Sequence, residues 1–136
     1  VEPGLGFDQV ELLVSRGVPP AKITLSHTDR TADPEYHRAL LRAGVNLEYD
    51  RMLRAPLDAA NPTLRLAAAM LPEFPDQVML GTDGARPTYW RSYGGSPGLD
   101  WLLRGFSDLL RAAGVGDALL RKAFVETPAR AFAFRT

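Results

Sequence analysis

The sequence contains no cysteine, so it can form neither a disulfide nor a metal site with thiolate ligands. It also lacks an apolar run long enough to cross a bilayer, because Arg, Glu or Pro interrupts every hydrophobic stretch. The 16 basic and 16 acidic residues leave a formal net charge of zero, which argues against nucleic acid or a membrane surface as a partner. These absences predict a cytoplasmic protein.

Several common catalytic motifs are absent as well. There is no glycine-rich phosphate loop, no serine in a nucleophile elbow and no His-Glu-x-x-His helix. The chain does have 46% hydrophobic residues over 136 positions, which is enough apolar material for the core of one small unit. Its chemistry must therefore be sought in the side chains that follow its structural elements.

Helical and strand-like patterns alternate along the whole chain. Short β-rich runs predict strands near 22–27, 45–50 and 77–82. Apolar residues at helical spacing, bounded by Pro and Gly, predict helices near 7–16, 34–43, 62–71 and 98–113, with one or two more in 116–134. Such alternation is typical of an α/β fold in which adjacent parallel strands are joined by crossover helices.

Polar side chains follow each predicted strand at its carboxyl end: His27 and Asp29, then Asp50 and Arg51, then Asp83. In parallel α/β sheets, binding sites lie beyond this edge, and His and Asp are common ligands of zinc and similar ions. Position alone leaves ordinary alternatives open. A histidine after a strand often only hydrogen-bonds to a loop, and an aspartate there often caps a turn or a helix.

Four segments resemble the carboxyl-terminal half of phosphotriesterase-like proteins, a family of the amidohydrolase superfamily. The stretches 23–37 and 44–51 resemble its sixth and seventh strands, 78–83 resembles its eighth strand, and 124–132 resembles the segment that closes its barrel, with Thr127 where Asn is usual. The resemblance implies a partial (β/α)₈ TIM barrel over 1–136, comprising strands six to eight with their helices. A complete barrel needs about 250 residues.

The same resemblance implies a site that holds two divalent metal ions, expected to be zinc. His27 would be a metal ligand from strand six, and Asp83 would be the catalytic carboxylate of strand eight, which binds a metal and accepts a proton. Asp29 and Arg30 would support the ligand histidine from behind. The implied reaction is hydrolysis of an ester, namely a lactone, a carboxylic ester or an organophosphate, by a metal-activated hydroxide.

Four further residues are expected to bind the small-molecule ester substrate. Arg51 would orient a substrate oxygen, although a salt bridge with a neighbouring aspartate is an equally good interpretation. Tyr89, Trp90 and Tyr93 lie in the loop after the third predicted strand, which walls the substrate pocket in the resembling family. The aromatic rings suit an apolar substrate, or they simply pin the loop to the fold.

The family's remaining metal ligands, which belong to earlier strands, have no counterpart in this sequence. A single His and a single Asp should hold metal poorly. The alternative hypothesis is therefore a non-catalytic half-barrel that is inactive alone, or that assembles with a partner. The expected partners are the missing amino-terminal half of the barrel or a second copy in a homodimer, because both edges of the sheet would otherwise stay unpaired.

The pattern also makes three predictions about packing. His37 stands among Arg and Glu residues and is expected on the surface. Trp101 and Phe106 recur at helical spacing and are expected in the core. Ile23 and Leu25, or their neighbours, are expected to point towards the interior of the barrel.

Overall fold

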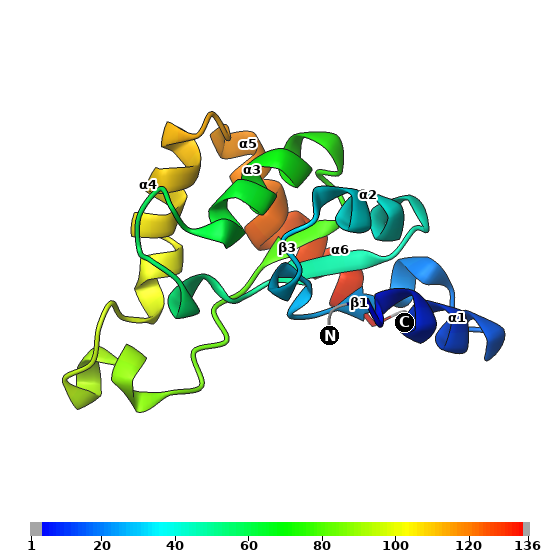
Figure 1. Cartoon of the computed structure of the whole chain (residues 1–136), viewed down its shortest axis with the longest axis horizontal. Helices are drawn as coiled ribbons and strands as arrows, with labels where there is room; N and C mark the ends of the chain where they lie inside the picture. Colours follow the sequence, from blue (N-terminus) through cyan, green and yellow to red (C-terminus); the bar gives the residue numbers. More distant parts are fainter. Residues whose placement is uncertain (1–3, 135–136) are drawn as a thin grey trace.

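The computed structural model describes residues 4–134 of the chain (Figure 1). Three strands and six α-helices follow one another in the predicted alternation. Their bounds are α1 Gly6–Ser15, β1 Thr24–Leu25, α2 Pro34–Arg42, β2 Asn46–Tyr49, α3 Pro62–Glu73, β3 Val78–Leu80, α4 Gly105–Ala112, α5 Asp117–Arg121 and α6 Thr127–Phe132. Within this described part, no helix is long and apolar enough to cross a membrane.

The three strands form one parallel sheet in the order β1-β2-β3, which confirms the predicted arrangement. Thr24 pairs with Asn46 and Leu47 pairs with Val78, so the strands are in step. The strands are shorter than predicted. β1 ends early because the backbone turns into a left-handed conformation at His27, which cannot continue a ladder. The sheet of the described residues therefore stays narrow, with β1 and β3 as its two outer strands.

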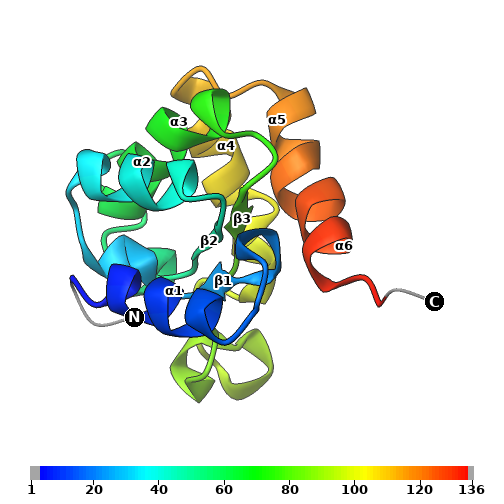
Figure 2. The same ribbon diagram turned by 90° about the vertical axis from the view of Figure 1, so that its right-hand side faces the viewer.

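One face of the sheet forms the hydrophobic core with the helices. Leu47 and Tyr49 on β2 are fully buried on this face, and the Tyr49 ring meets the His37 ring of α2. Leu25 pairs in register with Leu47, so it lies on the same side of the sheet, and its side chain there is only 3% exposed. Figure 2 shows the helices arranged around the sheet. Ile23 and Leu25 both belong to this core, which leaves their neighbours as the residues that could face the interior of a barrel.

The opposite face of the sheet is mixed, with the buried Met79 of β3 beside polar side chains of β2. It carries Asn46 and Glu48, which alternate with the core residues of β2. The Ser26 hydroxyl donates to Glu48 Oε2 at 2.7 Å, and the other carboxylate oxygen fills the space where a side chain at Gly81 would begin. Glu48 thus reaches from the end of β1 to the end of β3, and a side chain at position 81 would have to displace its carboxylate.

Helix ends follow the signals that the sequence carries. Asp33 caps α2 by accepting from the Glu35 amide at 2.9 Å, with Pro34 in the first turn. Asn61 caps α3 in the same way, accepting from the Thr63 amide at 3.0 Å. Gly44 terminates α2 with φ of 89°, a left-handed value that glycine adopts without steric cost.

The helix predicted over 98–113 is two pieces. A short 3₁₀ turn spans Leu99–Leu102, and α4 begins only at Gly105, because the backbone at Arg104 leaves the helical region. Gly105 packs against the Trp101 ring, where a Cβ atom would collide with the indole. Phe106 is fully buried and Trp101 packs partly against it at 5.5 Å between ring centroids, so the predicted core role is confirmed.

The last two helices, α5 and α6, form one continuous rod. This rod is bound to the residues just before β3. A π-helical turn over Lys122–Glu126 joins α5 to α6. Lys122 forms an ion pair with Asp76 at 2.6 Å, and the Thr127 hydroxyl donates to the Pro75 carbonyl at 3.2 Å. These contacts hold the rod beside β3 (Figure 2).

Candidate functional site

The carboxyl edge of the sheet is where the predicted site residues gather. His27 follows β1, Asp50 follows β2 and Asp83 follows β3. Among the described residues, His27 and Asp83 are the non-glycine residues with positive φ, at 59° and 40°. A backbone held in this region costs about 1–3 kcal/mol per residue and persists where surrounding structure enforces it, often at functional sites. This edge is therefore strained at the two positions proposed from the sequence to bind metal.

His27 is oriented by a buried aspartate. Its Nδ1 lies 2.8 Å from Oδ1 of Asp50, whose side chain is almost fully buried, while the imidazole itself is half exposed. Burial raises the pKa of Asp50, and the hydrogen bond from His27 partly opposes this. The arrangement fixes the ring and directs Nε2 away from Asp50, as in histidines that bind metal through one nitrogen and a carboxylate through the other. The sequence marked Asp50 as a strand-end residue but did not predict this partnership.

Asp29 supports the site by joining three segments of the chain. Its Oδ2 accepts from the Arg51 backbone amide at 2.9 Å and from the Thr63 hydroxyl at 2.6 Å. The other oxygen, Oδ1, is buried and has no hydrogen-bond partner among residues 4–134. Asp29 thus positions the loop after β2 and the start of α3. Arg30, expected beside it, is exposed.

Arg51 is engaged through its backbone. The expected alternative was a salt bridge with a neighbouring aspartate, and the observed link to Asp29 uses the amide of Arg51 instead of its guanidinium. The side chain is half-buried at the end of β2. Its role towards a substrate remains a prediction.

Asp83 forms an ion pair with Arg54, a residue that the sequence analysis did not single out. The Arg54 guanidinium bonds to Oδ2 of Asp83, and the side chains are only 24% and 20% exposed. Arg54 ends a 3₁₀ turn over Met52–Arg54 directly after β2. In a sequence rich in arginine, nothing distinguished Arg54 from the others; only the folded turn brings it to Asp83.

The loop over 84–98 projects from the body of the chain (Figure 1, yellow-green). The Trp90 indole N–H donates to the Gly84 carbonyl at 2.6 Å, and its ring meets Tyr93 at 5.6 Å between centroids. Trp90 therefore pins its part of the loop to Gly84, the residue after Asp83. Tyr93 is 71% exposed, whereas Tyr89 packs partly against the core.

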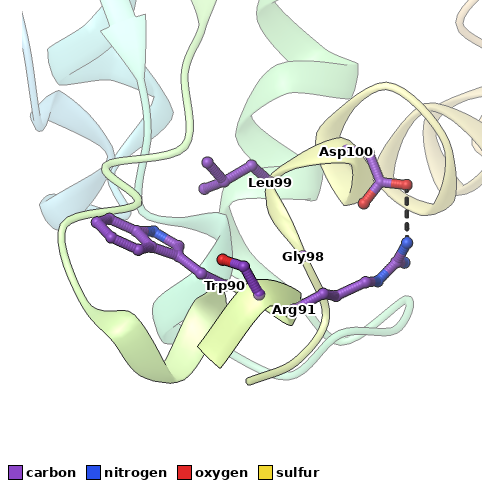
Figure 3. A pocket seen from close by; sticks show the side chains of 6 residues that line it. Trp90, Arg91, Gly98, Leu99 and Asp100 are labelled. Atoms are coloured by element: carbon purple, nitrogen blue, oxygen red, sulfur yellow. Dashed lines mark hydrogen bonds and ion pairs between the residues drawn. The ribbon is translucent and has the colours of Figure 1, made fainter. Parts of the chain in front are cut away.

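A hollow of about 360 Å³ opens in this loop, between Trp90, Arg91, Gly98, Leu99 and Asp100 (Figure 3). The indole and the Leu99 side chain supply apolar surface, and Leu99 itself is 50% exposed. Arg91 forms an ion pair with Asp100 at 3.1 Å at the rim. The hollow combines an apolar wall with a charged border.

His37 is not on the surface as expected. It is fully buried on the inner side of α2, with Leu40 and Leu41 three and four residues further along. Its Nε2 donates to the Thr31 carbonyl at 2.8 Å, and its Nδ1 lies 3.0 Å from the Tyr49 hydroxyl. Burial lowers the pKa of His37. The charged neighbours in sequence misled the prediction, because helical spacing places them on the other face.

The described residues do not by themselves make a metal site. In 4–134, no group of three or more His, Cys, Asp or Glu side chains could hold a metal ion. The free Nε2 side of His27 and the carboxylate of Asp83 are donors of the kinds that zinc accepts. A metal centre built on these two donors would need further ligands.

Comparison with known proteins gives a consistent result. The Phosphotriesterase family matches residues 1–132. A lactonase from Listeria monocytogenes is 30% identical, with a TM-score of 0.83 over 96% of this chain and 41% of its own. A mutant organophosphorus hydrolase from Deinococcus radiodurans is 29% identical, with a TM-score of 0.72 over 97% of this chain and 44% of its own.

A phosphotriesterase homology protein from Escherichia coli shares the fold at 24% identity, with a TM-score of 0.82 over 96% of this chain and 45% of its own. No curated protein sequence matches. The chain thus spans less than half the length of each of these three solved structures. With its family matched over nearly all its residues, this chain belongs to the phosphotriesterase family.

Proposed function

We propose that this chain forms strands six to eight, the carboxyl-terminal half, of a barrel hydrolase that cleaves esters. The candidate substrates are a lactone, a carboxylic ester or an organophosphate. The observation that carries the proposal is the strained backbone at His27 and Asp83, at the carboxyl edge of the sheet, with His27 oriented by buried Asp50. The lactonase and organophosphorus hydrolase among its structural relatives support the choice of ester chemistry.

In this proposal, His27 and Asp83 hold divalent ions, two in the complete barrel and most simply zinc. Bound divalent ions supply a nucleophilic hydroxide at neutral pH and polarise the ester carbonyl or phosphoryl oxygen. Asp50 keeps the His27 ring in its binding orientation. The Asp83 carboxylate accepts the proton released as the ester is attacked, which is the work of a general base.

The substrate is proposed to lie between the sheet edge and the loop over 84–98. Arg51 would meet a substrate oxygen from the end of β2. Tyr89, Trp90 and Tyr93 would bound the apolar part of the substrate, with the hollow beside Trp90 receiving it (Figure 3). Because Trp90 also pins the loop, its contribution to binding includes holding this wall in place.

A second candidate function is a non-catalytic half-barrel. It is favoured by the lack of a three-residue ligand group within 4–134 and by the two outer strands of the narrow sheet. Such a chain would be inactive alone and would pair across its sheet edges with an amino-terminal barrel half or with a second copy. Both candidates are placed in the cytoplasm.

The first experiment assays the 136-residue chain with zinc, manganese or cobalt against lactones and an aryl phosphotriester. We expect no turnover above that of the metal alone. Metal-dependent turnover by the chain that disappears in Asp83→Asn would contradict the need for further ligands.

The second experiment uses a protein in which this segment completes a barrel. Asp83→Asn should lower kcat by roughly 10²–10⁴-fold, because the general base is lost. Asp108→Asn, on the exposed side of α4, is the matched control and should keep wild-type kcat. An Asp83→Asn variant with near wild-type kcat would remove Asp83 from the proposed chemistry.

A further inference from the structure

We propose that Arg54 is a positioning residue that fixes the loop over 84–98 beside the sheet edge by holding Asp83 at the base of that loop. The inference rests on the proposed function in one respect only, namely that this loop bounds the ester substrate. Neither the sequence pattern nor the family match assigns a role to Arg54. The observation behind it is the ion pair between the Arg54 guanidinium and Oδ2 of Asp83.

The loop over 84–98, which projects from the body of the chain in Figure 1, keeps its shape through bonds within itself. The Ser96 amide donates to the Thr88 carbonyl at 2.9 Å, and the Gly98 amide donates to the Tyr89 carbonyl at 3.0 Å. These bonds join the two arms of the loop to each other. The loop can therefore change its position relative to the sheet without changing its own fold.

The base of this loop is narrow. A Cβ atom on Gly84 would collide with the Leu99 side chain, so the chain enters and leaves the loop at closely packed residues. The Trp90 indole N–H also donates to the Gly84 carbonyl at 2.6 Å, which ties the loop to its own entrance. The position of the whole loop therefore depends on how firmly residues 83 and 84 are held.

Asp83 is held by a side chain that itself starts from a fixed segment. Met52 and Leu53, the two residues before Arg54, are 0% and 6% exposed and belong to the hydrophobic core. The Met52 carbonyl also accepts from the Asn61 side-chain amide at 3.0 Å, which ties this turn to the start of α3. The guanidinium thus connects the base of the loop to the body of the fold.

Partial burial makes this pair a stronger tie than the ion pair at the rim of the loop. The side chains of Arg54 and Asp83 are 24% and 20% exposed, whereas those of Arg91 and Asp100 are 63% and 37% exposed. Water screens exposed pairs until little attraction is left, and partly buried pairs retain more of it. Tyr89 packs partly against the core as well, but an apolar contact has no preferred direction. The charged pair therefore supplies the directional hold at the base of the loop.

This hold decides how much space is left for a substrate. The hollow beside Trp90 lies within the loop and moves with it (Figure 3), whereas His27 and Asp50 belong to the sheet edge. Arg54 therefore sets the separation between the apolar wall and His27. The size of the ester that fits between them follows from that separation.

The position of the loop can be measured directly, because a chain without cysteine accepts spin labels at chosen positions. Ser92→Cys labels an exposed position of the loop, and Ala43→Cys labels an exposed position after α2. Pulsed electron paramagnetic resonance then gives the distribution of distances between the two labels. Arg54→Gln should widen this distribution at least about twofold, because a released loop samples positions that the ion pair excludes.

Controls separate the ion pair from a general effect on the fold. Arg86→Gln removes an exposed arginine of the same loop and should leave the width unchanged. Arg54→Lys keeps the charge and should restore a narrow distribution. Labels at Ala43 and Ala113, both outside the loop, should keep their distance in every variant. Asp83→Asn added to Arg54→Gln should widen the distribution no further, because the effects of two residues that act as a pair are not additive.

Each unfavourable outcome overturns the role of Arg54. These outcomes are a wild-type width in Arg54→Gln, a widening that Arg54→Lys does not reverse, and an equal widening between the two labels outside the loop. None of these measurements involves a metal or an ester. The proposed hydrolysis is tested separately, by the kcat of Asp83→Asn in a completed barrel, so either proposal can fail while the other stands.

Discussion

Replacing Tyr49 by phenylalanine should lower the free energy of unfolding by about 1–3 kcal/mol, the usual cost of leaving a buried polar atom unpaired. The Thr31 carbonyl can only accept, so His37 carries its proton on Nε2 and its bare Nδ1 accepts from the Tyr49 hydroxyl at 3.0 Å. Both rings are 0% exposed, so water cannot replace the lost donor. Urea denaturation of the two proteins measures the difference, provided that the slope against urea stays constant.

Tyr36→Phe is the matched control. The Tyr36 hydroxyl accepts from the Gly6 amide at 2.9 Å in a partly buried position, less enclosed than that of the fully buried Tyr49. We expect a loss of about 0.5–1.5 kcal/mol there. A Tyr49→Phe variant that loses no more than the Tyr36→Phe control would refute the reasoning that His37 depends on this donor.

Three further predictions concern titration and the loop after β3. Burial lowers the pKa of His37, so the imidazole takes up a proton more readily in the unfolded chain than in the folded one. The free energy of unfolding should therefore fall as the pH drops from about 6.5 towards the folded pKa. His37→Leu should flatten this pH dependence in denaturation curves. Gly95→Ala should loosen the loop over 84–98, because its Cβ would collide with the Thr88 carbonyl, and limited proteolysis should cut the variant faster. Trp90→Phe keeps the ring but loses the bond to the Gly84 carbonyl, so amide exchange in the loop should accelerate while the core keeps its protection; unchanged loop exchange would disprove the pinning role.

Local signals explain what the sequence could predict. Pro34 at the start of α2 and Gly44 after its end act within one turn of the chain, and both helix ends were located from them. The parallel strand order follows from the alternation of strands and helices, which leaves few topologies. The prediction of one helix over 98–113 failed because Arg104 departs from helical geometry where Gly105 packs against Trp101. The composition of the segment does not reveal that contact.

Contacts between residues that are far apart in the sequence explain what the sequence could not predict. His27 meets Asp50 and Arg54 meets Asp83 across separations of 23 and 29 residues, and each pairing depends on where a short turn directs a side chain. The ends of the predicted strands marked His27, Asp50 and Asp83 as site candidates but did not show which residues pair. His37 was misplaced for a related reason, since sequence neighbours were weighed above helical phase.

The left-handed backbone at His27 and Asp83 has a consequence for engineering. Glycine, or asparagine to a smaller degree, adopts such φ values at less cost than most residues, so either substitution would relax the fold locally. A library screened for thermal tolerance alone should therefore enrich glycine at position 27 or 83 wherever this relief outweighs the lost pairing with Asp50 or Arg54, and each such gain would delete a proposed metal ligand. At these two positions, the residues that favour thermal stability differ from those that the proposed catalysis needs. An engineering effort that seeks both properties should keep positions 27 and 83 unchanged and introduce stabilising substitutions in the helices.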